Sequence, residues 1–188
     1  MAALPDHPAP PERVTKIDAA RRQLATAIML WFTGGDSVSI YTLSHAAYEV
    51  IHNITKEFRT HDLLFDSLMV RDEFRPQVNT MLREPANFFK HAKRGKAENP
   101  VLEFHPEISE LFIFFAVCGL RYASISLADE ERAFSIWLTI QRPNFVTEKG
   151  REFLENKLPV ESINQIRRMS PGDYFHGFME ARRSVDRR

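Results

Sequence analysis

The sequence predicts an all-α, bundle-like single domain built around one buried central helix. Three observations lead to this prediction. Apolar residues recur at helical spacing in several segments, as in Ile17, Leu24, Ile28 and Trp31. Glycine and proline stand between these periodic segments rather than at hairpin spacing, which disfavours an all-β fold. The run Leu111–Leu120 is apolar on every side of a helix, so a helix over 107–127 is expected to have no solvent face.

The 188 residues are predicted to divide into a tail, a helical domain and a C-terminal extension. Residues 1–14 lack apolar periodicity and are rich in proline, so we expect a disordered tail. Residues 15–158 are expected to form the helical domain, and residues 159–188 a helical extension or tail.

Helix ends can be assigned from capping residues in the first half of the chain. Thr15 with Asp18 resembles a capping box, which places the first helix start there. Gly34 and Gly35 are expected to end this helix, and Asp36 or Ser37 to cap the next. The second helix is predicted to bury a stripe of apolar residues, namely Ile40, Leu43, Ala47, Val50 and Ile54.

The second half of the chain contains shorter periodic segments. Residues 71–82 are expected to form a short amphipathic helix, and Pro85 to begin a separate one, because its missing N–H has no cost in a first turn. Residues 99–106 are a predicted connector. Asp129 is expected to cap a helix that Pro143 ends, and further helices are expected near 147–157 and 174–183.

The overall charge excludes some classes of function. Lys plus Arg and Asp plus Glu both number 25, so no global charge attracts nucleic acid or membrane. The single cysteine, Cys118, permits neither an internal disulfide nor zinc spacing, which suits a reducing compartment. We therefore expect a cytoplasmic protein with no cofactor and no membrane contact.

The segment Arg83–Arg94 combines polar groups with a basic cluster. Within the predicted helix, Asn87 and His91 are four residues apart and would share one face. An imidazole can transfer protons near neutral pH, and nearby cations can hold a nucleic-acid backbone. The cationic residues predicted to bind RNA are Lys90, Lys93, Arg94 and Lys96. This set suits metal-independent RNA cleavage; the alternative is a helix end whose cations only complement the dipole.

The pattern Asn87-x-x-x-His91, followed by basic residues, resembles the core of the HEPN family. That resemblance implies a helical, often dimeric domain with RNase activity. The family usually carries an arginine four to six residues before the histidine, often directly before the asparagine, where this chain has Ala86. Arg83, outside that window, is the nearest upstream arginine and the candidate phosphate-stabilising group. More broadly, residues 42–50 and 86–94 resemble a group of uncharacterised bacterial all-helical proteins, which implies no activity.

His45, Glu49 and His52 form a second constellation, on the second helix. Their spacing contains one E-x-x-H, the pattern of di-iron bundles, so a metal site is an alternative. The three residues centre opposite the predicted apolar stripe, which predicts a solvated face. A homodimer contact lined by Tyr41, Tyr48 and the histidines is a further alternative.

The sequence therefore supports three functional hypotheses. The leading one is RNA binding or RNA cleavage around His91, with binding favoured over cleavage. The other two are a non-enzymatic homodimeric interaction protein and a metal-binding bundle.

Overall fold

A computed structural model describes residues 10–66, 71–91 and 100–186. Within these ranges the chain is helical and contains no strand, which confirms the all-α prediction. The elements are α1 (Lys16–Phe32), α2 (Ser37–Thr55), η1 (Leu64–Asp66), α3 (Arg75–Lys90), α4 (Ile108–Tyr122), α5 (Asp129–Gln141), η2 (Pro143–Phe145), α6 (Glu148–Glu155), α7 (Val160–Arg168) and α8 (Pro171–Asp186).

The first helix ends are those predicted from the sequence. The Thr15 hydroxyl accepts a hydrogen bond from the Asp18 N–H at 3.2 Å, and the Asp18 carboxylate accepts one from the Thr15 N–H at 3.2 Å. Gly34 follows α1 with φ of 68°, and the Gly35 N–H bonds back to the Leu30 carbonyl at 2.8 Å. This Schellman arrangement needs the left-handed conformation that glycine adopts at no steric cost. Asp36 caps α2 through the Ser39 N–H at 2.7 Å.

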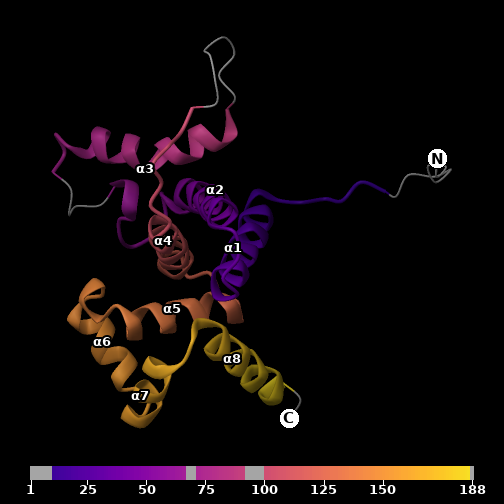
Figure 1. Cartoon of the computed structure of the whole chain (residues 1–188), viewed down its shortest axis with the longest axis vertical. Helices are drawn as coiled ribbons and strands as arrows, with labels where there is room; N and C mark the ends of the chain where they lie inside the picture. Colours follow the sequence, from indigo (N-terminus) through magenta and orange to yellow (C-terminus); the bar gives the residue numbers. More distant parts are fainter. Residues whose placement is uncertain (1–9, 67–70, 92–99, 187–188) are drawn as a thin grey trace.

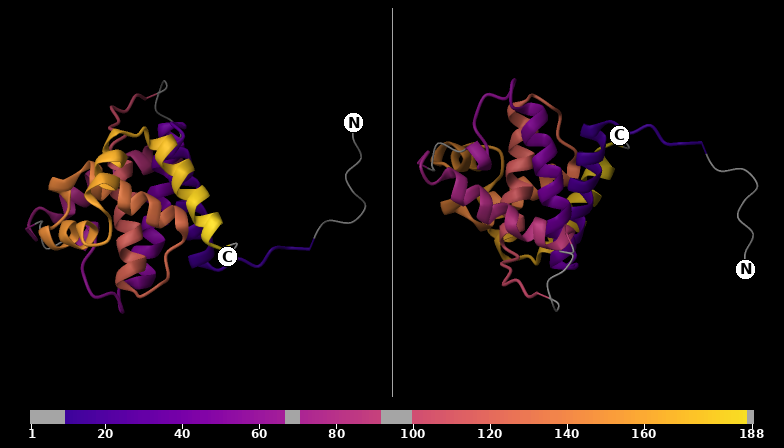
Figure 2. Two further views of the ribbon diagram at one scale, coloured as in Figure 1. Left: turned by 90° about the horizontal axis from the view of Figure 1, so that it is seen from below. Right: turned by 90° about the horizontal axis from the view of Figure 1, so that it is seen from above.

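Helices α1, α2 and α4 form the middle of the molecule (Figure 1). Helix α3 lies on one side of this group, and α5 crosses the other side, with α6, α7 and α8 beyond it. Helices α2 and α4 run side by side (Figure 2). They are parallel, because Tyr41 and Phe112 near their starts are in contact, as are Ile51 and Gly119 near their ends.

Aromatic rings fill the core between α2 and α4. The Phe112 ring is completely buried and lies 5.6 Å from the ring of Tyr41, 4.9 Å from His45 and 5.5 Å from Tyr48. Farther along, a Cβ atom on Gly119 would come within 2.9 Å of the Ile51 side chain. Gly119 therefore permits the close approach of the two helices.

The predicted central helix over 107–127 differs from α4 in length and in burial. Helix α4 ends at Tyr122, because Ser124 adopts φ of 59° and the Ile125 N–H bonds back to the Leu120 carbonyl at 2.9 Å. One side of the helix is only half-buried, so the expectation of no solvent face is wrong. This side carries Leu111, Phe114, Phe115, Cys118 and Tyr122.

Pro85 does not begin a helix, contrary to the prediction. It lies inside α3, which is continuous from Arg75 to Lys90. A proline inside a helix costs about 3 kcal/mol. Burial of Leu82, Pro85 and Ala86 helps to offset this cost, and the Tyr41 hydroxyl donates to the Leu82 carbonyl at 2.6 Å. Packing against α2 therefore overrides the local signal.

Two other boundaries differ from the prediction. Ala128, rather than Asp129, precedes α5; the Glu131 carboxylate accepts a hydrogen bond from the Ala128 N–H at 2.7 Å. Helix α7 was not predicted, although the expected helices near 147–157 and 174–183 correspond to α6 and α8. Among the described helices, none has both the length and the apolar character needed to cross a bilayer.

Two phenylalanines of α4 provide a test of this packing. Phe112→Ala should lower the free energy of unfolding by about 3–5 kcal/mol, because a buried ring leaves a cavity. Phe114→Ala should cost clearly less, since Phe114 is only half-buried and its ring packs on Phe115 and Phe145. Denaturant unfolding of both variants measures the difference, and equal losses would contradict this description of α4.

Candidate functional site

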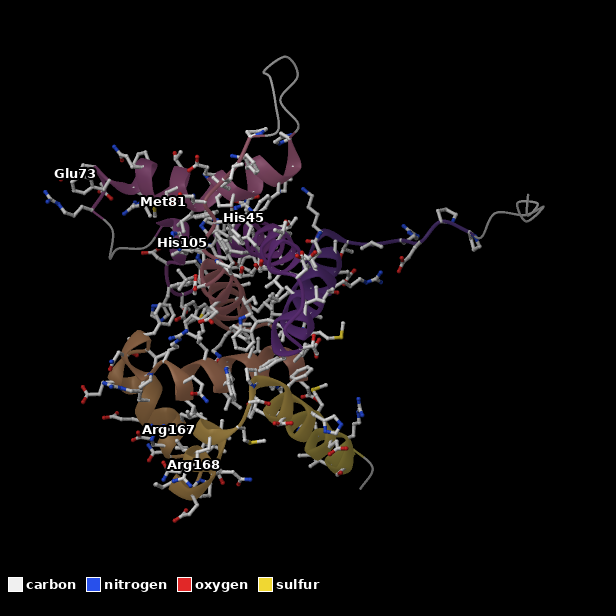
Figure 3. The ribbon with its side chains drawn as sticks, viewed as in Figure 1. His45, Glu73, Met81, His105, Arg167 and Arg168 are labelled. Carbon is white, nitrogen blue, oxygen red and sulfur yellow. The ribbon has the colours of Figure 1, made fainter. Side chains whose placement is uncertain are left out.

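Three of the residues predicted for candidate sites, His45, Glu49 and Arg83, lie together in a polar cluster between α2 and α3. At its base is His45, whose side chain is 2% exposed and sits beneath α3 (Figure 3). Its ring stacks against Tyr41 at 5.8 Å and meets the edge of Phe112 at 4.9 Å. Neither ring nitrogen has a hydrogen-bond partner within the described residues. An aromatic enclosure thus holds an imidazole whose polar atoms are unsatisfied.

Glu49 links this histidine to α3. One carboxylate oxygen lies 3.7 Å from Nδ1 of His45, and the other lies 3.4 Å from Nε of Arg83. The Arg83 guanidinium also lies over the Phe65 ring, with Cζ 4.2 Å from the ring centroid. Cation–π contact and ion pairing both fix the direction of the arginine. The Glu49 side chain is 35% exposed and that of Arg83 is 43% exposed, so the cluster reaches the surface.

Burial controls the protonation of His45. Removal from water lowers the pKa of His45 to about 4, against the opposing attraction of Glu49. Lys90 and Arg83 lower this pKa further by charge repulsion. The imidazole is therefore neutral at neutral pH, and general acid–base catalysis favours a pKa near the working pH. We conclude that His45 is poorly suited to transfer protons in a reaction.

The residues predicted around His91 lie at the end of α3. Asn87 and Lys90 are exposed in its last turn, and His91 is its exposed C-cap. The His91 backbone is extended, with φ of −121° and ψ of 105°, and its N–H bonds to the Asn87 carbonyl at 3.2 Å, so the helix ends here. Arg83, Asn87 and Lys90 share one face, at positions i, i+4 and i+7. Lys93, Arg94 and Lys96 lie outside the described residues.

The predicted solvated face of α2 is wrong. His45 is 2% exposed and His52 is 7% exposed, while Tyr41 and Tyr48 are completely buried. Helix α2 is enclosed on this side by α3, α4 and η1, a burial that the periodicity of α2 alone did not indicate. The same residues cannot form the predicted homodimer contact, because they are inside the protein.

The structure does not bring His45, Glu49 and His52 together as the predicted metal site requires. His45 approaches Glu49, whereas Nε2 of His52 lies 3.3 Å from the Asp66 carboxylate. The two histidines thus have different acidic partners. Across residues 10–66, 71–91 and 100–186, no three or more His, Cys, Asp or Glu side chains are grouped to hold a metal ion.

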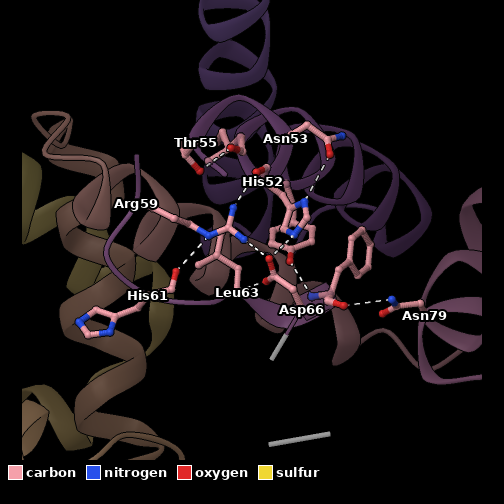
Figure 4. Close-up of polar contacts among 11 residues, drawn as sticks. His52, Asn53, Thr55, Arg59, His61, Leu63, Asp66 and Asn79 are labelled. Atoms are coloured by element: carbon pink, nitrogen blue, oxygen red, sulfur yellow. Dashed lines mark hydrogen bonds and ion pairs between the residues drawn. The ribbon is translucent and has the colours of Figure 1, made fainter. Parts of the chain in front are cut away.

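Sequence reasoning missed a buried polar network around Arg59 and Asp66 (Figure 4). The Arg59 guanidinium pairs with the Asp66 carboxylate and donates to the carbonyls of His52 at 2.8 Å and His61 at 3.0 Å. Asp66 also accepts from the Leu63 N–H at 2.8 Å. These contacts fix the segment after α2, and thereby Phe65 beneath Arg83. No periodic signal identifies Arg59 or Asp66, because both lie outside the α-helices.

Loss of Arg59 should strongly destabilise the protein. Its side chain is only 3% exposed, so Arg59→Ala leaves Asp66 and two carbonyls without their cation. Removing one partner of a buried pair typically costs about 3–5 kcal/mol. The matched control is Arg22→Ala, which breaks an exposed pair with Glu12 and should cost less than about 1 kcal/mol. Similar losses in urea unfolding would show that the network contributes little.

His45 should make stability depend on pH. The unfolded chain takes up this proton near pH 6.5 and the folded chain only near pH 4, so the unfolded state binds more protons in between. The contribution is complete above about pH 6.5 and is lost as the pH falls toward 4, by about 3 kcal/mol.

The His45→Phe variant tests this dependence, since an apolar ring suits the aromatic enclosure. The variant should lose less stability than the parent protein between pH 7 and pH 4 in denaturant unfolding. Some dependence should remain, because burial also lowers the pKa of His52. The control His176→Phe alters an exposed ring of α8 and should leave the pH dependence unchanged. Identical pH profiles for His45→Phe and the parent would contradict the assignment.

Comparison with known proteins does not assign the site. No family model matches the sequence, no curated protein matches it, and no solved structure matches the fold. The HEPN resemblance therefore stays a prediction, and the functional argument depends on the residues themselves.

Proposed function

We propose that the protein binds the phosphate backbone of RNA, without cutting it, through the end of α3. The observation that carries this proposal is the shared face of Arg83, Asn87 and Lys90. All three side chains reach the surface, and an amide between two cations suits phosphate oxygens. Arg83 and Lys90 are separated by roughly 10 Å along the helix axis.

Two features make the cations decisive for binding. The C-terminal end of a helix carries a partial negative charge, which disfavours a phosphate there by about 0.3–1 kcal/mol. Affinity must therefore come from the cationic side chains rather than from backbone N–H groups. Lys93, Arg94 and Lys96 follow His91 directly in the sequence and extend the same basic segment.

The contacts of the site favour binding over cleavage. Metal-independent cleavage needs a proton-transfer group and a phosphate-stabilising cation at the same phosphate. His45 is buried and neutral, and Arg83 is directed toward Glu49 and Phe65, about two turns before His91. The described contacts thus provide cations for a phosphate but no histidine paired with them.

The test is fluorescence anisotropy with an end-labelled single-stranded RNA of about 20 nucleotides, titrated at several KCl concentrations with EDTA present. Binding should weaken steeply with salt, as expected for counterion release. Lys90→Ala, Lys93→Ala and Arg94→Ala should each weaken binding and reduce the salt slope by about 1. The control Lys157→Ala removes an exposed lysine after α6 and should change neither quantity.

Two results would overturn the proposal. One is the absence of measurable affinity at low salt, or affinity that Lys157→Ala reduces as much as Lys90→Ala. The other is RNA cleavage that persists in EDTA and is abolished by His91→Ala, which would establish a catalytic site instead of a binding surface.

A further inference from the structure

We infer that a second site, formed by α4, α5, η2 and α7, binds a small amphipathic carboxylate. Two adjoining cavities of about 260 Å³ and 370 Å³ share Glu110, Leu138 and Arg142 as lining residues. Together they fall in the size range of small-molecule sites. The site lies across the molecule from α3 (Figure 1), so it is separate from the proposed RNA surface.

The smaller cavity has an excess of positive charge. It is lined by Arg142, Arg167 and Glu110, together with the neutral residues Trp31, Trp137, Leu138, Gln141 and Met169. The Arg167 guanidinium donates to the Asn164 amide oxygen at 3.4 Å. An arginine that faces a neutral partner retains donors for a carboxylate.

Arg142 lies at the junction of the two cavities. Its Nε is 3.6 Å from a Glu110 oxygen, longer than a hydrogen bond, and its side chain is 58% exposed. It can therefore attract Glu110 and still offer N–H groups to a second anion. Glu110 is only 17% exposed, and burial raises its pKa despite Arg142. An incoming cation would compete with Arg142 for Glu110, whereas an anion would meet two arginines.

The larger cavity supplies the apolar part. Its lining consists mainly of Ile108, Leu111, Leu138 and Phe145, with Glu107 and Glu110 at the polar side. Phe145 is 42% exposed here, a large apolar ring that a ligand chain could cover. A molecule with its carboxylate at Arg142 and Arg167 would place a short hydrocarbon chain against these side chains. The arrangement therefore fits a medium-chain carboxylic acid better than a purely polar anion.

The two tryptophans provide a direct readout. The chain has two, Trp31 and Trp137, and both line the smaller cavity. We would titrate the full-length protein with octanoate at pH 7 and follow tryptophan fluorescence, with octylamine and octanol as probes of the same chain length. Octanoate should produce a saturable change, and the other two probes should bind at least about tenfold more weakly, as expected when charge-assisted hydrogen bonds are lost.

Variants of two neighbouring arginines supply the matched control. Arg142→Gln and Arg167→Gln should each weaken octanoate binding about tenfold or more. Arg168→Gln should leave it unchanged, because Arg168, labelled beside Arg167 in Figure 3, does not line either cavity. Arg167 and Arg168 are both exposed, so both variants should fold, which thermal melting verifies.

The inference fails under any of three results. These results are no saturable change with octanoate, binding of octanol or octylamine as tight as that of octanoate, and a loss of binding in Arg168→Gln as large as in Arg167→Gln. Each result would show that the cavity does not recognise a carboxylate through Arg142 and Arg167.

Discussion

The contact between α2 and α4 is the constraint on which the rest of the structure depends. Phe112 inserts its ring among Tyr41, His45 and Tyr48, and Gly119 lets the same helices approach at their other ends. Two parallel helices joined in this way need a long connection, and the chain supplies it with η1 and α3. That connection then covers the remaining side of α2. Both histidines of α2 are consequently inside the bundle, although α2 and α4 each keep a half-buried side.

This enclosure determines the chemistry available to the histidines of α2. An imidazole surrounded by aromatic rings loses water without gaining hydrogen bonds, so its neutral form is favoured. His52 is also buried, but it lies within reach of Asp66, whose other partners are Arg59 and the Leu63 N–H. The same helix thus carries one histidine in an apolar pocket and one beside a polar network. Both environments suit a packing role of the histidine better than a catalytic one.

The two ends of the molecule offer different surfaces. The end near α3 carries the cations Arg83 and Lys90, with Glu49 holding Arg83 in position. The end near α5 and α7 combines arginines with tryptophan and aliphatic side chains around a cavity. An extended polyanion suits the first surface, where Arg83 and Lys90 lie along one face of a helix. A compact amphipathic anion suits the second, where apolar area and charge lie side by side.

The sequence by itself determined the helical class, both ends of the first helix and the start of the second. Thr15, Asp18, Gly34 and Asp36 act through bonds to residues a few positions away, so their effects can be read locally. It also placed Arg83, Asn87 and Lys90 in one candidate segment, although with the wrong helix start.

Only the tertiary structure decided which side of α2 is buried, whether Pro85 begins or interrupts a helix, and which carboxylate holds Arg83. Each of these depends on a partner far away in the sequence: Phe112 for His45, Tyr41 for the turn at Pro85, and Glu49 for Arg83. Periodicity describes one helix at a time and assumes a single buried face. A helix enclosed by several neighbours violates that assumption, and its polar residues become part of the interior.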